Sequence, residues 1–231
     1  LGVLGGMGPQ ATNTFYQLVI DRTDARTDQE HVNALILSDC QMPDRTAAIL
    51  GTAEEQEAVF RRLLADARLL EGAGCTVLAV PCNTSHFFLD RVQEHIGVPI
   101  LNMIRETAAA LKRQGRTRPG ILATDGTIRT GLYQKECAAF GLEAAPPEPA
   151  VQRLVMSIIY EEIKRWVRGS REKFAQIDRA LASMGCDCAI LGCTELSVFR
   201  SYHSLPPFYV DAMEVLAELA VVRCGKQLRT I

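Results

Sequence analysis

The stretch that decides the fold is VLAVPCNTS, at residues 77–85. An apolar run of strand length ends at Cys82, small hydrogen-bonding residues follow it, and a helix-like segment covers residues 86–95. The same order returns at residues 188–196, CAILGCTEL, around Cys193. A cysteine between a strand and a helix lies close to unpaired backbone N–H groups and to the positive end of the helix dipole. Both lower the pKa of a thiol below its free value of about 8.5. The repeat therefore predicts two reactive thiols that face each other across one substrate.

Two further pairs of residues extend this repeat along the chain. The separations are 118 positions from Gly2 to Gly120, 111 from Cys82 to Cys193 and 108 from Pro99 to Pro207. Strands that alternate with helices favour a parallel sheet, so we expect an α/β fold with two pseudo-symmetric lobes, each a parallel sheet flanked by helices. We place the first lobe at residues 1–101 and 212–231, closed by the C-terminal helix, and the second at residues 102–211.

The residues that could take part in catalysis or binding follow the carboxyl ends of the predicted strands. In parallel α/β sheets, ligands bind in the crevice beyond these ends. The glycine-rich turn at 5–6, Cys82, Thr124 and Cys193 all fall there. We therefore expect them to converge on one active site in the cleft between the lobes.

Local patterns give further expectations about individual segments. The apolar stripe over 151–168 predicts one amphipathic helix, and residues 130–140 predict another. Short strands are expected at 98–102 and 142–145.

Composition and charge exclude several classes of function. With 48% hydrophobic and 23% charged residues, the 231-residue chain is typical of a globular protein of one large or two small domains. The net charge of −2 and the lack of a basic run give no indication of a nucleic-acid or membrane partner. No apolar stretch approaches the roughly 18 residues of a membrane span. Because Leu1 falls inside an apparent strand, we expect further residues before it.

The eight cysteines indicate a reducing compartment rather than a disulfide framework. The chain is long, contains no Cys-x-x-Cys, and its four histidines have no zinc-ligand spacing, so we expect no metal site and a cytoplasmic location. Cys186 and Cys188 flank an aspartate, and a redox or metal role is conceivable, but core packing is the expected one.

Two opposed thiols suit the inversion of a carbon centre. A thiolate can remove the proton α to a carboxylate on one face while a thiol returns a proton on the other face. Each such acid or base contributes about 10²–10⁴-fold in rate, and the remainder comes from donors aimed at the developing charge. Asn83, Thr84 and Thr194, beside the two cysteines, are suitable donors, together with the N–H groups of the glycine-rich turn.

Four motifs carry a resemblance to a known family. They are Gly-Gly-Met-Gly-Pro at 5–9, Pro-Asp-Arg-Thr at 43–46, Pro-Cys-Asn-Thr-Ser at 81–85 and Gly-Cys-Thr-Glu-Leu at 192–196. In this order the chain resembles the aspartate/glutamate racemase family over nearly its whole length. The turn at 5–8 differs from the Asp-Ser-Gly type of the glutamate racemases, so the resemblance points to the aspartate racemase branch.

The resemblance implies a racemase of free amino acids that needs no cofactor and forms a homodimer. It implies Cys82 and Cys193 as the catalytic residues, with Arg45 and Lys164 binding the carboxylates of the substrate. The remaining predicted substrate-binding residues are Met7, Asn83, Thr84, Thr124, Thr127 and Thr194.

Other readings of the same residues stay open. Within the superfamily, an isomerase or decarboxylase could act on a dicarboxylic or hydantoin substrate. A thiol redox sensor would need the two sulfurs at about 2.05 Å, and an amino-acid-binding module would not need them at all. The glycine-rich turn is not Gly-x-Gly-x-x-Gly, which leaves phosphate binding as a weak alternative. Glu195 is expected to begin a helix, with the orientation of a neighbour as the alternative. His86 is expected on a helix surface, with an effect on Cys82 as the alternative.

Overall fold

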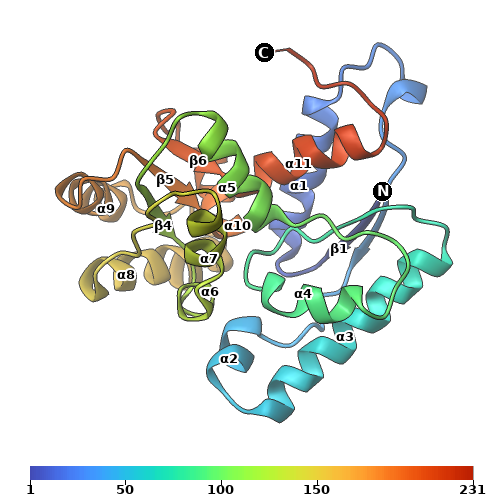
Figure 1. Ribbon diagram of the computed structural model, residues 1–231, viewed down its shortest axis with the longest axis horizontal. Helices are drawn as coiled ribbons and strands as arrows, with labels where there is room; N and C mark the ends of the chain where they lie inside the picture. Colours follow the sequence, from blue (N-terminus) through green and yellow to red (C-terminus); the bar gives the residue numbers. More distant parts are fainter. Residues whose placement is uncertain (231) are drawn as a thin grey trace. The chain divides into compact units, whose positions relative to one another are not determined.

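The computed structural model describes residues 1–230 and divides into two compact units. The first unit comprises Leu1–Met103 and the chain from Met213 onward, and the second is Ile104–Ala212. Each unit contains a three-stranded parallel sheet with helices around it (Figure 1). The predicted fold class, α/β with two parallel sheets flanked by helices, is confirmed.

The first unit is built on the sheet order β2-β1-β3. Its strands are β1 (Gly2–Gly5), β2 (Leu35–Ser38) and β3 (Leu78–Ala79). Its helical segments are α1 (Pro9–Arg22), η1 (Asp28–Glu30), α2 (Arg45–Leu50), α3 (Ala53–Gly72), α4 (His86–Gln93) and, from its second residue on, α11 (Ala212–Arg223). An ion pair between Arg22 and Glu214 joins α1 to α11, which ties the end of the chain to its beginning.

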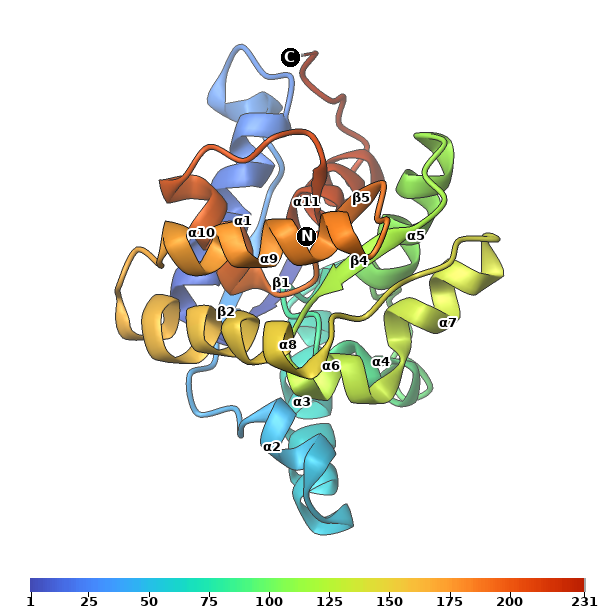
Figure 2. The same cartoon turned by 90° about the vertical axis from the view of Figure 1, so that its left-hand side faces the viewer.

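The second unit has the sheet order β4-β5-β6. Its strands are β4 (Pro119–Leu122), β5 (Cys188–Leu191) and β6 (Tyr209–Asp211). Its helices are most of α5 (Met103–Arg113), then α6 (Asp125–Thr130), α7 (Leu132–Ala139), α8 (Pro149–Met156), α9 (Arg171–Ser183) and α10 (Thr194–Tyr202). A widened π-type turn, η2 (Ser157–Glu162), and a 3₁₀ turn, η3 (Ile163–Arg165), follow α8. Helix α8 packs alongside α9 (Figure 2).

The internal repeat predicted from the sequence is present in the register of the two sheets. Isolated parallel bridges add Ile100 to the first sheet, beside Leu78, and Ala145 to the second, beside Gly120. One row of register partners then crosses each sheet, Leu35, Gly2, Leu78 and Ile100 in the first and Ala145, Gly120, Ala189 and Tyr209 in the second. Numbered along the chain of each unit, the strand positions follow the order second, first, third, fourth across both rows. The two units therefore share one topology.

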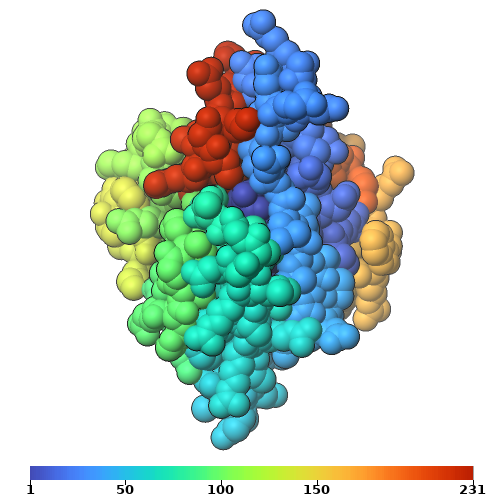
Figure 3. Space-filling view, turned by 90° about the vertical axis from the view of Figure 1, so that its right-hand side faces the viewer, coloured from blue at the N-terminus to red at the C-terminus, as the bar shows by residue number. Residues whose placement is uncertain are grey.

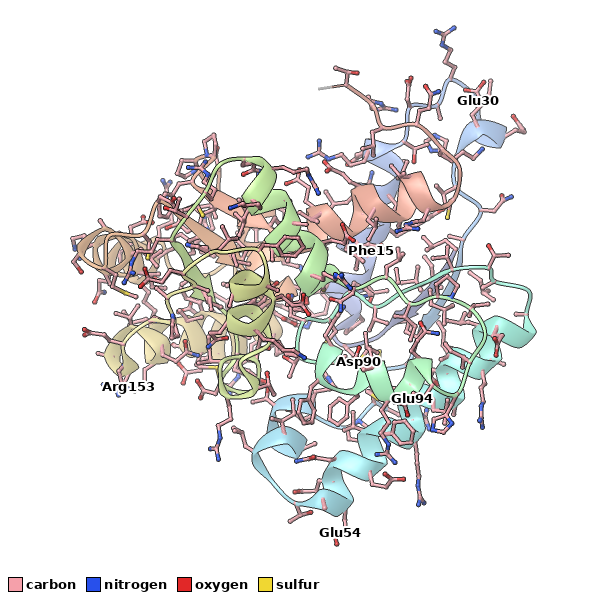
Figure 4. The ribbon with its side chains drawn as sticks, viewed as in Figure 1. Phe15, Glu30, Glu54, Asp90, Glu94 and Arg153 are labelled. Carbon is pink, nitrogen blue, oxygen red and sulfur yellow. The ribbon has the colours of Figure 1, made fainter. Side chains whose placement is uncertain are left out.

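The helices begin where the sequence supplies caps. Thr52 and Glu55 form a reciprocal capping box at the start of α3, which satisfies two backbone N–H groups that would otherwise lack partners. Val59, Leu63 and Ala67 place the apolar side of α3 in the core, and its opposite side lies on the surface of the first unit (Figure 3). Glu54 extends from the first turn of α3, where a negative charge is favourable (Figure 4).

Several local expectations are corrected. The segments 98–102 and 142–145 form single bridges rather than strands. The helix expected at 130–140 is α7, which begins after Gly131 with a left-handed φ of 66°, and a separate short helix, α6, precedes it. Residues 151–168 do not form one helix, because the backbone widens after Met156 and the helical run ends at Trp166, φ 64°. Apolar spacing alone does not reveal a widened turn, since the buried positions remain on one side.

None of the helices within residues 1–230 combines the length and the apolar character of a membrane span.

Candidate active site

In the first unit, the turn after β1 is fixed against the end of β2. Gly6 has φ +86°, and a Cβ at this position would lie 2.3 Å from the carbonyl carbon of Asp39. Its backbone N–H donates to the hydroxyl of Thr12 at 2.9 Å. Only glycine fits this close approach of two backbones, which brings the next residue, Met7, into a buried position.

Met7 connects the other predicted residues of the first unit. The hydroxyl of Ser85, just after the Cys82 loop, donates to the sulfur of Met7 at 3.2 Å. The Arg45 guanidinium donates to the carbonyl oxygen of Met7 at 3.3 Å and to that of Pro43 at 2.9 Å. Arg45 is the first residue of α2, which Asp44 caps by accepting the N–H of Ala47 at 2.8 Å. The structure thus brings together the glycine-rich turn, the start of α2 with Arg45, and the loop that carries Cys82.

Cys82 lies in the buried segment between β3 and α4, with 5% of its surface exposed. Asn83 and Thr84 beside it are also buried. His86, expected on a helix surface, is buried instead, and its ring contacts the carbonyl oxygen of Cys82 through Nδ1 at 3.0 Å. This contact of a buried side chain ties the start of α4 to the backbone of Cys82.

In the second unit, two predicted threonines lie at the end of β4. Thr124 is the N-cap of α6 and accepts the backbone N–H of Thr127 at 3.3 Å. The two hydroxyls lie 3.2 Å apart, and both side chains are buried. This helix start holds a pair of hydroxyl groups in fixed positions.

Cys193 lies immediately before α10, with 6% of its surface exposed. Its thiol donates to Oε2 of Glu195 at 2.9 Å, and Oε1 of the same carboxylate accepts the Lys164 ammonium at 2.7 Å. The Thr194 hydroxyl lies 3.4 Å from Oε2. Burial, and next the charge of Glu195, raise the pKa of Cys193 well above its ordinary value, while Lys164 acts in the opposite direction. The expectation that the helix start lowers this pKa is therefore wrong for Cys193.

The sequence did not show that Glu195 and Lys164 meet beside Cys193. Of the two roles considered for Glu195, beginning a helix was favoured over orienting a neighbour, but the side chain is 5% exposed and connects Cys193 to Lys164. Lys164 lies in η3, the 3₁₀ turn that follows the widened turn after α8, and its ammonium contacts the Glu195 carboxylate from there. Only the three-dimensional arrangement shows the contact, since the two residues are 31 positions apart.

A longer form of the repeat was available in the sequence. Residues 70–84 and 181–195 align without a gap at the 111-residue offset and share a leucine, a glycine and two cysteines. Cys75 and Cys186 are therefore a second equivalent pair, and the N–H of each donates to the leucine carbonyl five residues before it at 3.1 Å. A Cβ on Gly2 would lie 3.0 Å from the sulfur of Cys75, and one on Gly120 would lie 3.3 Å from that of Cys186. This second pair packs against the first strand of each sheet.

All eight cysteines, which lie within the described residues, are free thiols. In the same part of the chain, no three His, Cys, Asp or Glu side chains gather in a way that could hold a metal ion.

Comparison with known proteins gives one consistent family. A sequence profile of Asp/Glu/hydantoin racemases matches residues 4–220. The broad-specificity amino-acid racemase RacX of Bacillus subtilis (strain 168) is 29% identical over 228 residues, 96% of this chain and 96% of that protein. The Picrophilus torridus aspartate racemase structure has a TM-score of 0.82 at 28% identity, covering 99% of this chain and 95% of that one. An aspartate racemase homologue from Pyrococcus horikoshii OT3 shares the fold, with a TM-score of 0.76, 24% identity, and coverage of 97% and 98%.

Two units of one topology, each with a buried cysteine shortly after its third strand position, make an α/β fold built on an internal repeat. The chain belongs to the Asp/Glu/hydantoin racemase family, and it is an isomerase of the racemase class. The resemblance seen in the sequence motifs is confirmed.

Proposed function

We propose that this chain is an aspartate racemase that inverts Cα with two thiols, those of Cys82 and Cys193, and without a cofactor. The observation that carries the proposal is the equivalence of the two cysteines. Leu78 and Ala189 hold the same place in the two register rows, and each cysteine follows its row residue by four positions. A reaction that must run in both directions between mirror-image substrates suits two acid–base groups at equivalent places of a repeated unit.

In the proposed mechanism, one cysteine as thiolate removes the Cα proton, and the other as thiol returns a proton on the opposite face. The roles exchange in the reverse direction. Arg45 and Lys164 bind the carboxylates of the substrate and stabilise the negative charge that develops beside Cα. The proposed lining of the site is completed by Met7, Asn83, Thr84, Thr124, Thr127 and Thr194. The proposal requires both thiols to reach one substrate carbon.

Aspartate is the proposed substrate because two observations favour it. The turn at 5–8 is Gly-Gly-Met-Gly, without the acidic residue of the glutamate branch. The Picrophilus torridus aspartate racemase is similar to nearly the whole chain. A second candidate, racemisation of several amino acids, is favoured by the similarity to the broad-specificity enzyme of Bacillus subtilis. Chiral chromatography after incubation with L-aspartate, L-glutamate and neutral L-amino acids separates the two, because only the second candidate inverts neutral amino acids at comparable rates.

The decisive experiment removes each thiol in turn. Cys82→Ala and Cys193→Ala are each expected to lower racemisation in both directions by at least about 10²-fold, the contribution of one acid–base group. In deuterated water, the wild-type enzyme should incorporate deuterium at Cα during turnover. Full activity of either variant contradicts the two-thiol mechanism.

The second cysteine pair supplies matched controls. Cys75→Ala and Cys186→Ala remove thiols at equivalent positions of the same repeat, outside the proposed site. Both variants should keep activity close to that of the wild type. If loss of Cys75 or Cys186 alone abolished turnover while Cys82→Ala and Cys193→Ala remained active, the catalytic assignment would be wrong.

We also propose a homodimer in a reducing cytoplasm, where both thiols stay available for catalysis. Strand β2 is at the edge of the order β2-β1-β3, and its Leu35 and Ile36 are 46% and 36% exposed. An exposed apolar edge strand is a surface that proteins normally cover. Sedimentation velocity should show a dimer for the wild type and a monomer for Leu35→Lys. A monomeric wild type contradicts the dimer.

A further inference from the structure

A buried carboxylate directly after β2 connects the turn after β1 to helix α3. Asp39 is 8% exposed, and its backbone packs so closely against Gly6 that a Cβ on the glycine would lie 2.5 Å from the Asp39 nitrogen and oxygen. The Arg62 guanidinium of α3 donates from Nε to Oδ2 of this carboxylate and from Nη2 to Oδ1, the latter at 2.9 Å. Asp39 is thus held by its backbone on one side and by its carboxylate on the other.

The same residue fixes the start of the loop that leads to Arg45. Oδ1 of Asp39 accepts the backbone N–H of Gln41 at 3.0 Å, and the Asp39 carbonyl oxygen accepts that of Met42 at 3.4 Å. At the other end of the loop, the Arg45 guanidinium donates to the carbonyl oxygen of Met42 at 3.4 Å. A chain of contacts therefore runs from Arg62 through Asp39 and this loop to Arg45.

Asp39 needs a cation because a second acid lies beside it. Asp66, one turn after Arg62 on α3, is 9% exposed and shares a hydrogen bond with Asp39. A buried carboxylate without a cation is costly, and two carboxylates at close range repel each other. Without the Arg62 guanidinium, Asp39 would have to move or take up a proton, and the loop that begins at its carboxylate would shift with it.

We propose that Arg62 is a positioning residue for the substrate-binding arginine, Arg45, and that it acts through Asp39. This inference rests on the proposed function, in which Arg45 binds a carboxylate of the substrate. The guanidinium holds the Asp39 carboxylate, the carboxylate holds the first turn of the loop, and the loop places Arg45 against the carbonyl oxygen of Met7. Arginine suits this role better than lysine, because its two parallel N–H groups match the two carboxylate oxygens.

The first test is Arg62→Gln, at a side chain that is 42% exposed. The KM for L-aspartate should rise about 10-fold and kcat should stay within about threefold of the wild type, because a displaced Arg45 weakens the binding of substrate and transition state alike. Titration calorimetry with succinate, an unreactive dicarboxylate, should show the same loss of affinity. Mere loss of folded protein would lower the apparent kcat and leave KM unchanged. Arg62→Lys, which keeps the charge but not the fork, should give an intermediate KM.

The neighbouring arginine on the same helix is a matched control. The Arg61 side chain is 77% exposed and pairs with Glu57, one turn earlier on α3. Arg61→Gln should therefore keep the KM and the succinate affinity of the wild type.

A double variant tests the route through Asp39, even if Arg62→Gln alone does not fold. Asp39→Asn combined with Arg62→Gln removes both members of the ion pair, so neither charge is left without its partner. Its KM should be no higher than that of Asp39→Asn alone, because residues that act as one unit have non-additive effects.

Three results would overturn the inference. They are a wild-type KM and succinate affinity in folded Arg62→Gln, an equal loss in Arg61→Gln, and a further rise in KM when Arg62→Gln is added to Asp39→Asn. The outcomes for the positioning role and for the racemase activity are separable. Loss of succinate affinity on Arg62→Gln in a chain that inverts no amino acid would refute the proposed function and leave the positioning role. An active racemase whose KM does not respond to Arg62→Gln would refute the positioning role alone, and a chain that neither racemises aspartate nor binds succinate would contradict both.

Discussion

The imidazole of His86 holds the backbone carbonyl oxygen of Cys82 through Nδ1, at a distance of 3.0 Å. A carbonyl oxygen can only accept, so Nδ1 carries the proton, and Nε2 accepts the backbone N–H of Met103 at 3.1 Å. Both contacts need the neutral ring, because a proton on Nε2 would face the Met103 N–H. Burial lowers the pKa of His86 to about 4.

This histidine predicts a loss of stability in acid. A pKa lowered from 6.5 to about 4 means that the unfolded chain binds the proton more tightly. The stabilising contribution is present above pH 6.5 and is lost as the pH falls toward 4, by about 3 kcal/mol. Urea unfolding at pH 7, 5 and 4 should show a larger loss of stability in acid for the wild type than for His86→Gln. His95→Gln, at an exposed histidine two residues beyond α4, should behave like the wild type.

The raised pKa of Asp66 should have the opposite effect on stability in the same pH range. Burial, and next the charge of Asp39, raise the pKa of Asp66 to about 6, while Arg62 binds Asp39 and lowers the pKa of that carboxyl. The contribution of Asp66 is fully present below its ordinary value of 3.8 and is lost as the pH rises through about 6. Asp66→Asn should therefore raise the free energy of unfolding at pH 7 by about 1–2 kcal/mol and have little effect at pH 4.

The effects of His86 and Asp66 partly cancel in the wild type between pH 4 and 6. His86→Gln should therefore reveal the effect of Asp66 on stability, and Asp66→Asn that of His86. Equal gains at pH 4 and pH 7 for Asp66→Asn would contradict the raised pKa. Glu94→Gln, at an exposed carboxylate, is the control for adding an amide.

The close packing around Gly192 allows a steric test of how Cys193 is positioned. A Cβ on Gly192 would lie 2.9 Å from Cε2 of the buried Tyr133 and 3.2 Å from the Cβ of Ala123. Gly192→Ala should therefore move the end of β5, cost about 1–3 kcal/mol of stability, and lower racemisation because the neighbouring thiol moves with it. Gly72→Ala, where a Cβ meets no atom within 4 Å, is the control and should keep both properties. Wild-type stability and turnover in Gly192→Ala would show that the packing around Tyr133 is adaptable.

The sequence by itself determined the two sheets and the place of the two cysteines. Strand, turn and helix follow from the local spacing of apolar residues, caps and glycines, and the 111-residue offset between Cys82 and Cys193 needs no structure to be seen. The register rows through Gly2 and Gly120 agree with that offset.

Tertiary structure alone decided what surrounds each thiol. The burial of His86 and the contacts of Glu195 with Lys164 and Cys193 depend on which side chains the folded backbone brings within hydrogen-bond distance. The widened turn after Met156, which precedes Lys164, leaves the apolar stripe unchanged and so leaves no trace in its spacing. Spacing along the chain encodes which residues face the core, whereas the electrostatic partners of a buried group come from segments far apart in sequence.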